Sequence, residues 1–563
     1  MARSLLQRNL IALSKNNGEL CSRLSDRDRD GGEKTVSRYK FQESRSGETI
    51  PAWLDSNGTA HPLHSTVDPG REAKRLIDTV ENGAFLTLLG LGGAYHAEAA
   101  LERGDIGMVL VVEHDLGGFQ ELLRHIDYTR LFEDPRFRLF VDVPGKELER
   151  QILDLYKPAL YGAFRVLPLR SRTNIEGEPF AAMARAIDSA LSQVSQDYSV
   201  QAHFGKRWFS NTVRNLKSAE TDNSAIPPIR RAVVFAAGPS LSLEIPALRE
   251  KYHEKKLEKG NGFFLIATDT SLPCLLSGGI KPDAVISIDC QHYSYYHFMD
   301  ALPEGSLLFL DLASPPLLAS RSKRVKFFTG GHPFTRYIAQ TWKALPELDT
   351  SGGNVCHAAV SLAEQLGAFE IEFYGADFSY PLGVTYAKGT YIYPLFERRQ
   401  NRLSPIEAQA SAFLYRTPLE KKTGPQSQSL WAGQQRQPGN AYWYYETQIL
   451  SFYRERLKEK TESMEASFAQ GERPQKAFTT GKAAIDSREF LRHYRTEILR
   501  LPKPGKNATS YQADLDGKAR SVFTTILPLA AAIKHRRPQC GFGDLIEETK
   551  SFCVREIDAI LAQ

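Results

Sequence analysis

Short apolar runs alternate with segments of helical periodicity over most of the chain. One group of runs lies between residues 64 and 165, and a second group begins at Arg231. Continuous apolar runs are typical of strands that are buried on both faces of a parallel sheet, and the helical segments between them indicate crossover helices. The pattern therefore predicts an α/β protein with two Rossmann-like α/β domains.

The strands expected from these runs are short, and several of them end in glycine or aspartate. They are 85–89, 108–113 and 137–141 in the first group, and 232–235, 263–267, 284–288, 307–310, 326–328 and 371–374 in the second. Each group therefore reads as a series of β-α-β units.

The segments outside these groups have a different pattern. Residues 1–60 are polar and interrupted by charges, which favours short β-hairpins or a loose entry segment. A polar loop follows the second group, and the remainder shows helical patterns. We expect four regions: residues 1–60, a first α/β domain with a helical bridge at 61–220, a central α/β domain at 221–415, and a polar loop with a helical C-terminal region at 416–563.

The central domain opens with a glycine turn, Gly238-Pro239-Ser240, which follows an apolar run and precedes a helical segment. A helix N-terminus presents unpaired N–H groups and a partial positive charge, so it can bind phosphate. Glycine lets the backbone approach a ligand closely, and serine can cap the helix or donate to a phosphate oxygen. The turn therefore predicts a phosphate site, with an ordinary strand–helix turn as the alternative.

Polar residues follow several of the expected strands of this domain. They are Thr268, Asp269, Asp289, Asp311, His332 and Asp377. Ligands of open parallel sheets bind at the carboxyl ends of the strands. A single aspartate there is also an ordinary helix cap, but several beside a Gly-Pro-Ser turn indicate a polar pocket for a nucleotide or for sugar hydroxyls.

A second element with the shape of a phosphate site is Gly352-Gly353-Asn354, which opens a helix with one apolar face. His357 lies in the first turn of this helix. It is either a structural donor or, near an anionic leaving group, an acid. Tyr386 and Lys388 follow the last strand of the domain, where they could reach a phosphate or belong to a surface loop.

The first domain carries its own glycine turn, Gly90-x-Gly92-Gly93, with Glu113 at the end of the next strand. This combination holds an adenosine ribose in some Rossmann-like proteins. We favour inherited architecture without a ligand, or a face for partner contact, over a cofactor site.

Composition narrows the class of protein. The 563 residues are too many for one core, and 42% hydrophobic with 24% charged residues is typical of a globular protein. A net charge of +5 argues against a dedicated nucleic-acid partner. No stretch approaches the ~18 apolar residues of a membrane span. The six cysteines are scattered, so we expect reduced thiols in the cytoplasm and neither a disulfide framework nor a zinc site.

A set of motifs in the central domain has a characteristic order: Gly238-Pro-Ser-Leu241, Ala267-Thr-Asp-Thr270, Gly279-Ile-Lys-Pro-Asp-Ala-Val-Ile-Ser-Ile-Asp289, Gly352-Gly-Asn-Val355, Leu366-Gly-Ala368, Tyr374-Gly-Ala-Asp377 and Thr385-Tyr-Ala-Lys-Gly389. The first domain adds 63–69, 90–96 and 111–115. This set resembles the motility accessory factor (Maf) family of flagellin glycosyltransferases, which shares its central domain with archaeal 6-hydroxymethylpterin diphosphokinases. The Gly-Pro-Ser turn is also similar to that of bacterial CMP-sialic-acid sialyltransferases, which implies a sialyltransferase-like central domain.

The resemblance implies transfer of a nonulosonic acid, pseudaminic or legionaminic, from its CMP-activated form to Ser or Thr of flagellin. It implies no tightly bound cofactor and leaves a need for a divalent metal open. The carboxylate of the donor sugar should meet an arginine or a helix N-terminus, and Arg336 is the candidate. The acceptor hydroxyl needs a base, for which Asp377, Asp289 and His332 are candidates.

Two further functions stay open at the level of sequence. A pyrophosphokinase acting on a pterin alcohol would need ATP and Mg²⁺, with Asp269, Asp289 and Asp377 facing the metal. The long chain and the additional N-terminal domain speak against it. A non-catalytic scaffold could use the same pocket to sense a nucleotide.

Overall fold

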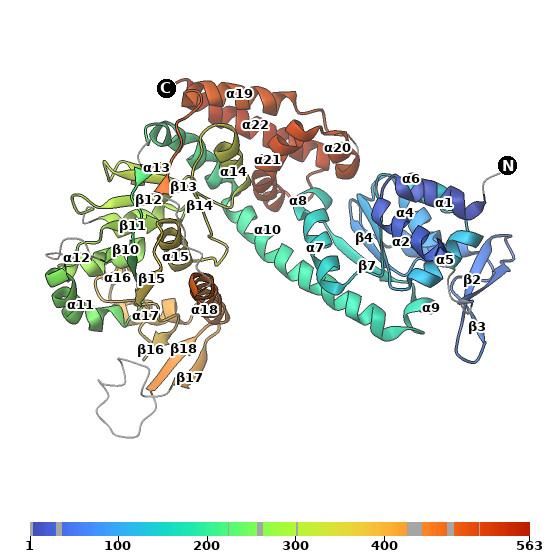
Figure 1. Cartoon of the computed structure of the whole chain (residues 1–563), viewed down its shortest axis with the longest axis horizontal. Helices are drawn as coiled ribbons and strands as arrows, with labels where there is room; N and C mark the ends of the chain where they lie inside the picture. Colours follow the sequence, from blue (N-terminus) through green and yellow to red (C-terminus); the bar gives the residue numbers. More distant parts are fainter. Residues whose placement is uncertain are drawn as a thin grey trace. The chain divides into compact units, whose positions relative to one another are not determined.

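The computed structural model describes residues 4–29, 37–222, 225–255, 263–299, 302–424, 442–469, 478–505 and 507–563. The chain divides into two compact units (Figure 1). Unit 1 comprises Met1–Gly205 with Ile498–Phe552, and unit 2 comprises Lys206–Glu497 with Cys553–Gln563. Each unit contains a parallel sheet with helices, so the expected α/β class with two Rossmann-like domains is confirmed.

Unit 1 begins with two helices, α1 (Leu5–Ser14) and α2 (Gly18–Arg29), where short β-hairpins or a loose entry segment were expected. Ser4 and Gln7 form a capping box at the start of α1, and Leu13 and Leu20 enter the core of the unit. A three-stranded antiparallel sheet follows, made of β1 (Tyr39–Glu43), β2 (Thr49–Leu54) and β3 (Ala60–Pro62).

The parallel sheet of unit 1 has the strand order β6-β5-β4-β7. Its strands are β4 (Phe85–Leu89), β5 (Met108–Glu113), β6 (Phe137–Val141) and β7 (Phe164–Pro168). Its helices are α3 (Pro69–Ile77), α4 (Tyr95–Glu102), α5 (Leu116–His125), α6 (Thr129–Glu133), α7 (Gly145–Leu155), α8 (Pro158–Tyr161), α9 (Arg170–Thr173), α20 (Ala508–Asp514) and α21 (Gly517–Arg536). The chain moves outward from β4 to β6 and then returns to the other side of β4, as in doubly wound folds.

Unit 2 contains a parallel sheet of seven strands in the order β14-β13-β12-β11-β10-β9-β15. The strands are β9 (Arg231–Phe235), β10 (Phe264–Thr268), β11 (Ala284–Ser287), β12 (Leu307–Asp311), β13 (Val325–Gly330), β14 (Glu347–Leu348) and β15 (Glu370–Tyr374). The helical elements are α10 (Gly177–Glu220, shared with unit 1), α11 (Leu241–Lys255), η1 (Asp269–Ser271), α12 (Leu272–Ser277), η2 (His292–Phe298), α13 (Pro316–Ala319), α14 (Pro333–Thr341) and α15 (Val355–Gln365). The strand order reverses between β9 and β15, so a crevice is expected at their carboxyl ends.

The two faces of this sheet are covered by different helices. On one face, Tyr252 of α11 packs edge-on against Phe235 of β9, with ring centroids 6.2 Å apart. On the other face, Ala359 and Leu362 of α15 share a core with Val234 of β9. Because crossover helices run antiparallel to the strands, the N-termini of α11 and α15 both lie at the carboxyl edge of the sheet.

Two asparagines of α10 hold the loops that follow β11 and β12. The Asn211 amide donates to the carbonyls of Cys290 (3.1 Å) and Ala313 (2.9 Å). The Asn215 amide donates to the carbonyls of Leu312 and Ser314. These buried bonds satisfy carbonyls at the carboxyl ends of β11 and β12 with protein groups.

The rest of unit 2 holds a small antiparallel sheet and further helices. The elements are β8 (Ala225–Ile226), β16 (Tyr380–Pro381), α16 (Ile392–Arg399), α17 (Ile406–Leu414), β17 (Glu420–Gly424), β18 (Tyr442–Glu446), α18 (Gln448–Ala469), β19 (Phe478–Thr479) and α19 (Ser487–Arg500), and the chain closes with α22 (Phe542–Leu561). Strands β16, β18 and β17 form one sheet in that order. The expected helical C-terminal region is confirmed, except that 442–446 is a strand. Most of the expected polar loop 416–440 lies outside the described residues.

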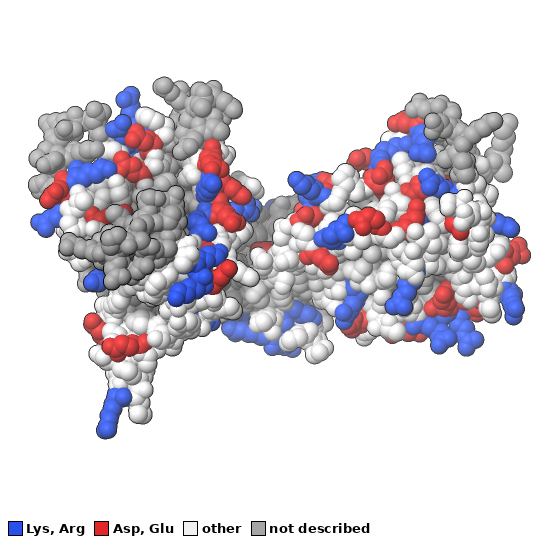
Figure 2. Space-filling model, turned by 90° about the horizontal axis from the view of Figure 1, so that it is seen from below, with Lys and Arg blue, Asp and Glu red and all other residues white. Residues whose placement is uncertain are grey.

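Over the described residues, no helix is long and apolar enough to cross a membrane. Basic and acidic side chains are intermixed on the face shown in Figure 2, in keeping with the small net charge of +5. All six cysteines are free thiols, and five of them are buried.

Candidate functional site

The carboxyl ends of β9 and β15 lie side by side in unit 2, and two glycines bring the residues after these strands together. The N–H of Gly238 donates to the carbonyl of Gly375 over 2.7 Å. Gly375 has φ +68°, and a Cβ there would lie 2.4 Å from the carbonyl oxygen of Ala236. Only glycine combines this backbone angle with so close an approach. The first residues after both strands therefore form one tightly joined site.

Asp377 occupies the N-terminus of α11 in this site. Its Oδ2 accepts a hydrogen bond from the N–H of Ser240 over 2.8 Å. Burial raises the pKa of Asp377, and the bond from Ser240 opposes that rise. The carboxylate thus takes a backbone donor that the sequence analysis reserved for a phosphate oxygen. Pro239 is buried beside it, so the turn is a packed part of the unit.

A second carboxyl group lies in the first turn of α11. Glu244 has a buried Oε2 with no hydrogen-bond partner among the described residues. Its pKa is raised to about 7, first by burial and then by the charge of Asp377. The sequence analysis passed over this residue, because a glutamate in the first turn of a helix is also a common dipole partner. Together the two carboxyl groups make the start of α11 acidic.

The position of Asp377 leaves no room for a side chain at residue 238, which must therefore be glycine. A Cβ at Gly238 would lie 2.3 Å from Oδ2 of Asp377 and 2.4 Å from the carbonyl oxygen of Gly375. We therefore expect Gly238→Ala to displace Asp377 and to lower the free energy of unfolding by about 1–3 kcal/mol, as in other overpacked sites. Thermal or urea unfolding measures this loss.

The matched control is Gly104→Ala, because nothing lies within 4 Å of a Cβ at Gly104. It should leave the unfolding midpoint almost unchanged. Equal stability of Gly238→Ala and the natural chain would show that Asp377 is not held as described.

The N-terminus of α15 is capped by its own asparagine. Oδ1 of Asn354 accepts from the N–H groups of Cys356 (2.9 Å) and His357 (3.2 Å). Gly353 has φ +74°, and a Cβ there would lie 3.0 Å from the ring of Tyr453 in α18. The expected helix start is therefore present, but two of its backbone donors already have partners.

His357 lies behind this cap with a buried imidazole. Neither ring nitrogen has a hydrogen-bond partner among the described residues, although the residue is only 3% exposed. Burial is the main cause that lowers its pKa to about 4, so the ring is neutral at pH 7. Its ring centroid lies 6.4 Å from that of Phe378, the neighbour of Asp377. The start of α15 and the end of β15 therefore share one site.

Asp269 and Asp289 follow the next two strands, β10 and β11. Asp269 is 4% exposed and accepts from the N–H of Thr270 (2.7 Å) and from the hydroxyl of Ser287 (2.7 Å). Asp289 accepts from the N–H of Gln291 (2.9 Å). Burial raises the pKa of Asp289, and the charge of Asp269 adds to the rise. Thr268, buried beside them, bonds the hydroxyl of Ser271, so it supports the turn from within.

The loop after β15 covers the glycine turn. The N–H of Ala387 donates to the carbonyl of Ala237 (3.0 Å), and the N–H of Lys388 donates to the hydroxyl of Ser242 (2.7 Å). Burial raises the pKa of Tyr386 to about 12, while the Lys388 side chain is exposed. This loop therefore brings Tyr386 to the carboxyl edge of the sheet.

Three further residues interact near the carboxyl edge of the sheet, although no sequence motif marks them. Arg416 acts electrostatically on Tyr380 and on Tyr391, and Tyr391 also responds to the charges of Asp269 and Asp289. All three residues lie outside the regular parallel sheet, in the segments after β15. Arg416 thus acts on both tyrosines, and Tyr391 links this group to the two aspartates.

His332 and Arg336 lie elsewhere on the sheet. They follow β13, which is four strands from β9 in the sheet order. The His332 ring lies on Trp208 with a centroid distance of 4.0 Å, and burial lowers its pKa to about 4. Arg336 is exposed and pairs with Glu347 at 2.7 Å. The structure therefore does not bring these two candidates together with Gly238 and Asp377.

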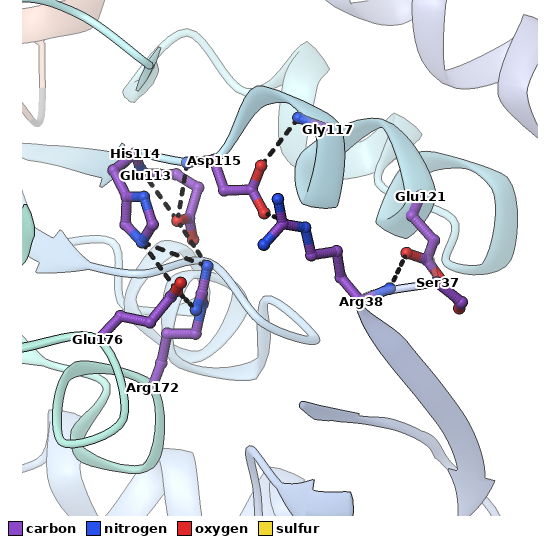
Figure 3. A network of polar contacts seen from close by, with 9 residues as sticks. All are labelled: Ser37, Arg38, Glu113, His114, Asp115, Gly117, Glu121, Arg172 and Glu176. Atoms are coloured by element: carbon purple, nitrogen blue, oxygen red, sulfur yellow. Dashed lines mark hydrogen bonds and ion pairs between the residues drawn. The ribbon is translucent and has the colours of Figure 1, made fainter. Parts of the chain in front are cut away.

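The polar residues at the end of β5, beside the glycine turn of unit 1, form a network with Arg172 and Glu176 (Figure 3). Glu113 is 1% exposed, accepts from the N–H of His114 (3.0 Å) and pairs with Arg172 (3.4 Å). Arg172 is fully buried, also pairs with Glu176, and lies 3.8 Å from the ring centroid of Trp53. Glu113 is thus engaged by an arginine of its own chain at the place where a ribose would bind.

One histidine–glutamate group adjoins the same turn. In the described part of the chain, His64, Glu72 and His96 have ligand atoms within 4.8 Å of one another. The N–H of Gly93 donates to Nε2 of His64 (2.8 Å), so the neutral ring carries its proton on Nδ1. Burial lowers the pKa of His64 to about 3, and Glu72 accepts from the N–H of Ser65 (2.8 Å). Nε2 of His64 is therefore engaged by the glycine turn, and Glu72 by the backbone at Ser65.

Comparison with known proteins agrees with this architecture. The family model described as 6-hydroxymethylpterin diphosphokinase MptE-like matches residues 206–383. A Treponema pallidum protein named only as uncharacterized is 30% identical over 173 residues, which are 30% of this chain and 79% of the relative. A second T. pallidum protein is 40% identical over 130 residues, or 22% of this chain and 46% of that relative. The chain belongs to the family of the first of these proteins.

The fold match extends over the whole chain. A solved structure titled as the MAf glycosyltransferase from Magnetospirillum magneticum AMB-1 aligns with 99% of this chain and 95% of its own, with a TM-score of 0.54 and 12% sequence identity. The chain therefore has the Maf glycosyltransferase fold, which confirms the resemblance seen in the motifs.

Proposed function

We propose that the chain is a glycosyltransferase that moves a nonulosonic, sialic-acid-like sugar from a CMP-sugar to Ser or Thr of flagellin, in the cytoplasm and without a tightly bound cofactor. The observation that carries the proposal is the arrangement of residues at the carboxyl ends of β9 and β15. There, a glycine-joined pair of strand ends, an Asp with a raised pKa and the starts of two helices meet in the fold of a Maf glycosyltransferase.

In this proposal the glycosidic C–O bond to the CMP phosphate breaks, and a new C–O bond forms to the hydroxyl oxygen of the acceptor. CMP leaves with the bonding electron pair, and the hydroxyl proton passes to a carboxylate. Asp377 is our first choice as this base, because it lies at the reversal of strand order. Asp289 is our second choice as the base. His332 is our third choice, because it follows β13, which is four strands from β9 in the sheet order.

The other proposed contacts are divided between the two ends of the donor. Gly238, Pro239 and Ser240 shape the crevice, and Thr268 and Asp269 border the sugar hydroxyls. Gly353, Asn354 and His357 border the side of α15, where a neutral His357 could donate to the leaving phosphate. Tyr386 and Lys388 come from the covering loop. The catalytic effect would be mainly positioning and stabilisation of the leaving group.

The test is a transfer assay with the purified chain, CMP-pseudaminic or CMP-legionaminic acid, and unglycosylated flagellin. We expect release of CMP and a mass increase of the acceptor by one sugar residue. An acceptor lacking Ser and Thr in its exposed segments is the control. No CMP release with either donor, from a chain that is folded, would overturn the proposal.

The MptE-like match over residues 206–383 favours one alternative, pyrophosphoryl transfer to a pterin alcohol. Asp269 and Asp289 are close enough to interact, as a Mg²⁺ site would need. The same protein incubated with ATP, Mg²⁺ and 6-hydroxymethylpterin separates the two functions. Formation of AMP and the pterin diphosphate would replace our proposal with this one.

A further inference from the structure

Arg416 lies just beyond α17, beside the segments that follow β15. Its guanidinium carbon lies 4.1 Å from the ring centroid of Phe413, and its side chain hydrogen-bonds Tyr380 of β16. The ring contact orients the planar guanidinium and leaves its edge donors for other partners. Arg416 is therefore held in place by aromatic groups while remaining exposed.

The arginine charge reaches three tyrosines at once. Burial raises the pKa of Tyr380, Tyr386 and Tyr391, and Arg416 opposes the rise for each of them. Asp269 acts in the other direction on Tyr386 and Tyr391. The ring of Tyr386 also packs against Phe413, the ring that holds Arg416, with centroids 6.2 Å apart. Because the next residue, Ala387, donates to the carbonyl of Ala237, this contact places Arg416 beside the loop that covers the glycine turn.

No carboxylate of the described residues forms an ion pair with Arg416. This distinguishes it from Arg336, whose guanidinium is engaged by Glu347. An arginine with ordered geometry and uncommitted donors suits an oxyanion better than an arginine already paired. The N-termini of α11 and α15 are weaker candidates for binding an oxyanion. Asp377 already accepts from a backbone N–H at the start of α11, and Asn354 does so at the start of α15.

We propose that Arg416, with Tyr380 and Tyr386 beside it, binds the anionic group of the nucleotide-sugar donor. The inference rests on the proposed function and names its anion-binding residue, in place of the Arg336 that the sequence suggested. The oxyanion is either the phosphate of the nucleotide or the carboxylate of the sugar. Both accept paired N–H donors from a guanidinium.

Binding experiments separate the two sources. CMP and cytidine differ only by the phosphate, and CMP and the intact CMP-sugar differ by the sugar with its carboxylate. The variants are Arg416→Ala, Arg416→Lys and the matched control Arg336→Ala, which removes an exposed arginine of the same unit. Isothermal titration of each variant gives the dissociation constants, and thermal unfolding confirms that each is folded.

If Arg416 binds the phosphate, Arg416→Ala should bind CMP about 10- to 100-fold more weakly and cytidine as before. If it binds the carboxylate, affinity for CMP should persist while the affinity for the intact CMP-sugar falls by about the same factor. Arg416→Lys should show a smaller loss of affinity for the same ligand, because an ammonium keeps the charge but lacks the paired donors. Arg336→Ala should bind all ligands like the natural chain.

Unchanged affinity of Arg416→Ala for both CMP and the CMP-sugar would overturn the inference while leaving the proposed function intact. Absence of any CMP or CMP-sugar binding in the natural chain would overturn the proposed function and the inference with it. Should Arg416→Ala fail to fold, Arg416→Lys and Tyr380→Phe, which removes the hydroxyl at this site, carry the same comparison.

Discussion

Replacing Asp377 by asparagine is expected to lower turnover by about 100-fold or more, the usual contribution of a positioned general base. In the natural chain the N–H of Ser240 donates to the Asp377 carboxylate over 2.8 Å. The carbonyl oxygen of the asparagine amide can accept the same hydrogen bond. The fold should therefore survive while the negative charge is lost. Steady-state rates of CMP release and sugar transfer measure the effect.

The pH dependence gives a second test of the same residue. Burial raises the pKa of Asp377 above that of an ordinary aspartate. A base acts only when it has lost its proton, so the rate of the natural chain should fall as the pH drops through this raised pKa. The acidic limb should be absent from Asp377→Asn.

Asp311 provides a matched control at the end of another strand. It is 1% exposed, its carboxylate accepts from the N–H of Ala313 (2.7 Å), and burial raises its pKa to about 7. Asp311→Asn should lower stability and leave the rate of the folded protein nearly unchanged. A normal rate in Asp377→Asn would instead identify Asp377 as a helix cap, and Asp289→Asn would then test the second candidate.

The strands were predictable because burial on both faces leaves a clear signal. The expected runs 232–235 and 371–374 correspond to β9 and β15, which pair in parallel with Val234 opposite Phe373. The joining of Gly238 with Asp377 also follows from the pattern once the strand order is known. Sequence alone does not supply that order, because it does not say on which side of β9 the strand β15 pairs.

Other features depend on packing that no local pattern records. Arg416 follows an unremarkable helical segment, and no local motif marks the role that we propose for it. Asn211 and Asn215 hold carbonyls far along the chain. The helix α1 is a different case, since the Ser4 and Gln7 capping box and the spacing of Leu6, Leu10 and Leu13 were visible in the sequence.

The buried charges of unit 1 yield the prediction with the largest expected effect on stability. Glu113→Ala leaves the fully buried Arg172 without one of its two carboxylate partners. Breaking a buried pair in this way costs about 3–5 kcal/mol, and we expect about 3 kcal/mol because Glu176 remains. A substitution at Gly92 would lower the free energy of unfolding further, since a Cβ there would lie 2.5 Å from the ring of His64.

Unfolding monitored by calorimetry and by proteolysis of unit 1 measures this loss. Arg38→Ala is the matched control: Arg38 belongs to the same network (Figure 3), but its side chain is 48% exposed and lies 3.5 Å from Asp115. Its removal should cost less than about 1 kcal/mol.

CMP release from the donor should persist in Glu113→Ala under conditions where the protein is folded, because every proposed catalytic and donor-binding residue belongs to unit 2. Loss of CMP release from folded Glu113→Ala would show that unit 1 contributes to the chemistry, and an unchanged unfolding midpoint would show that Glu113 does not hold Arg172 as described.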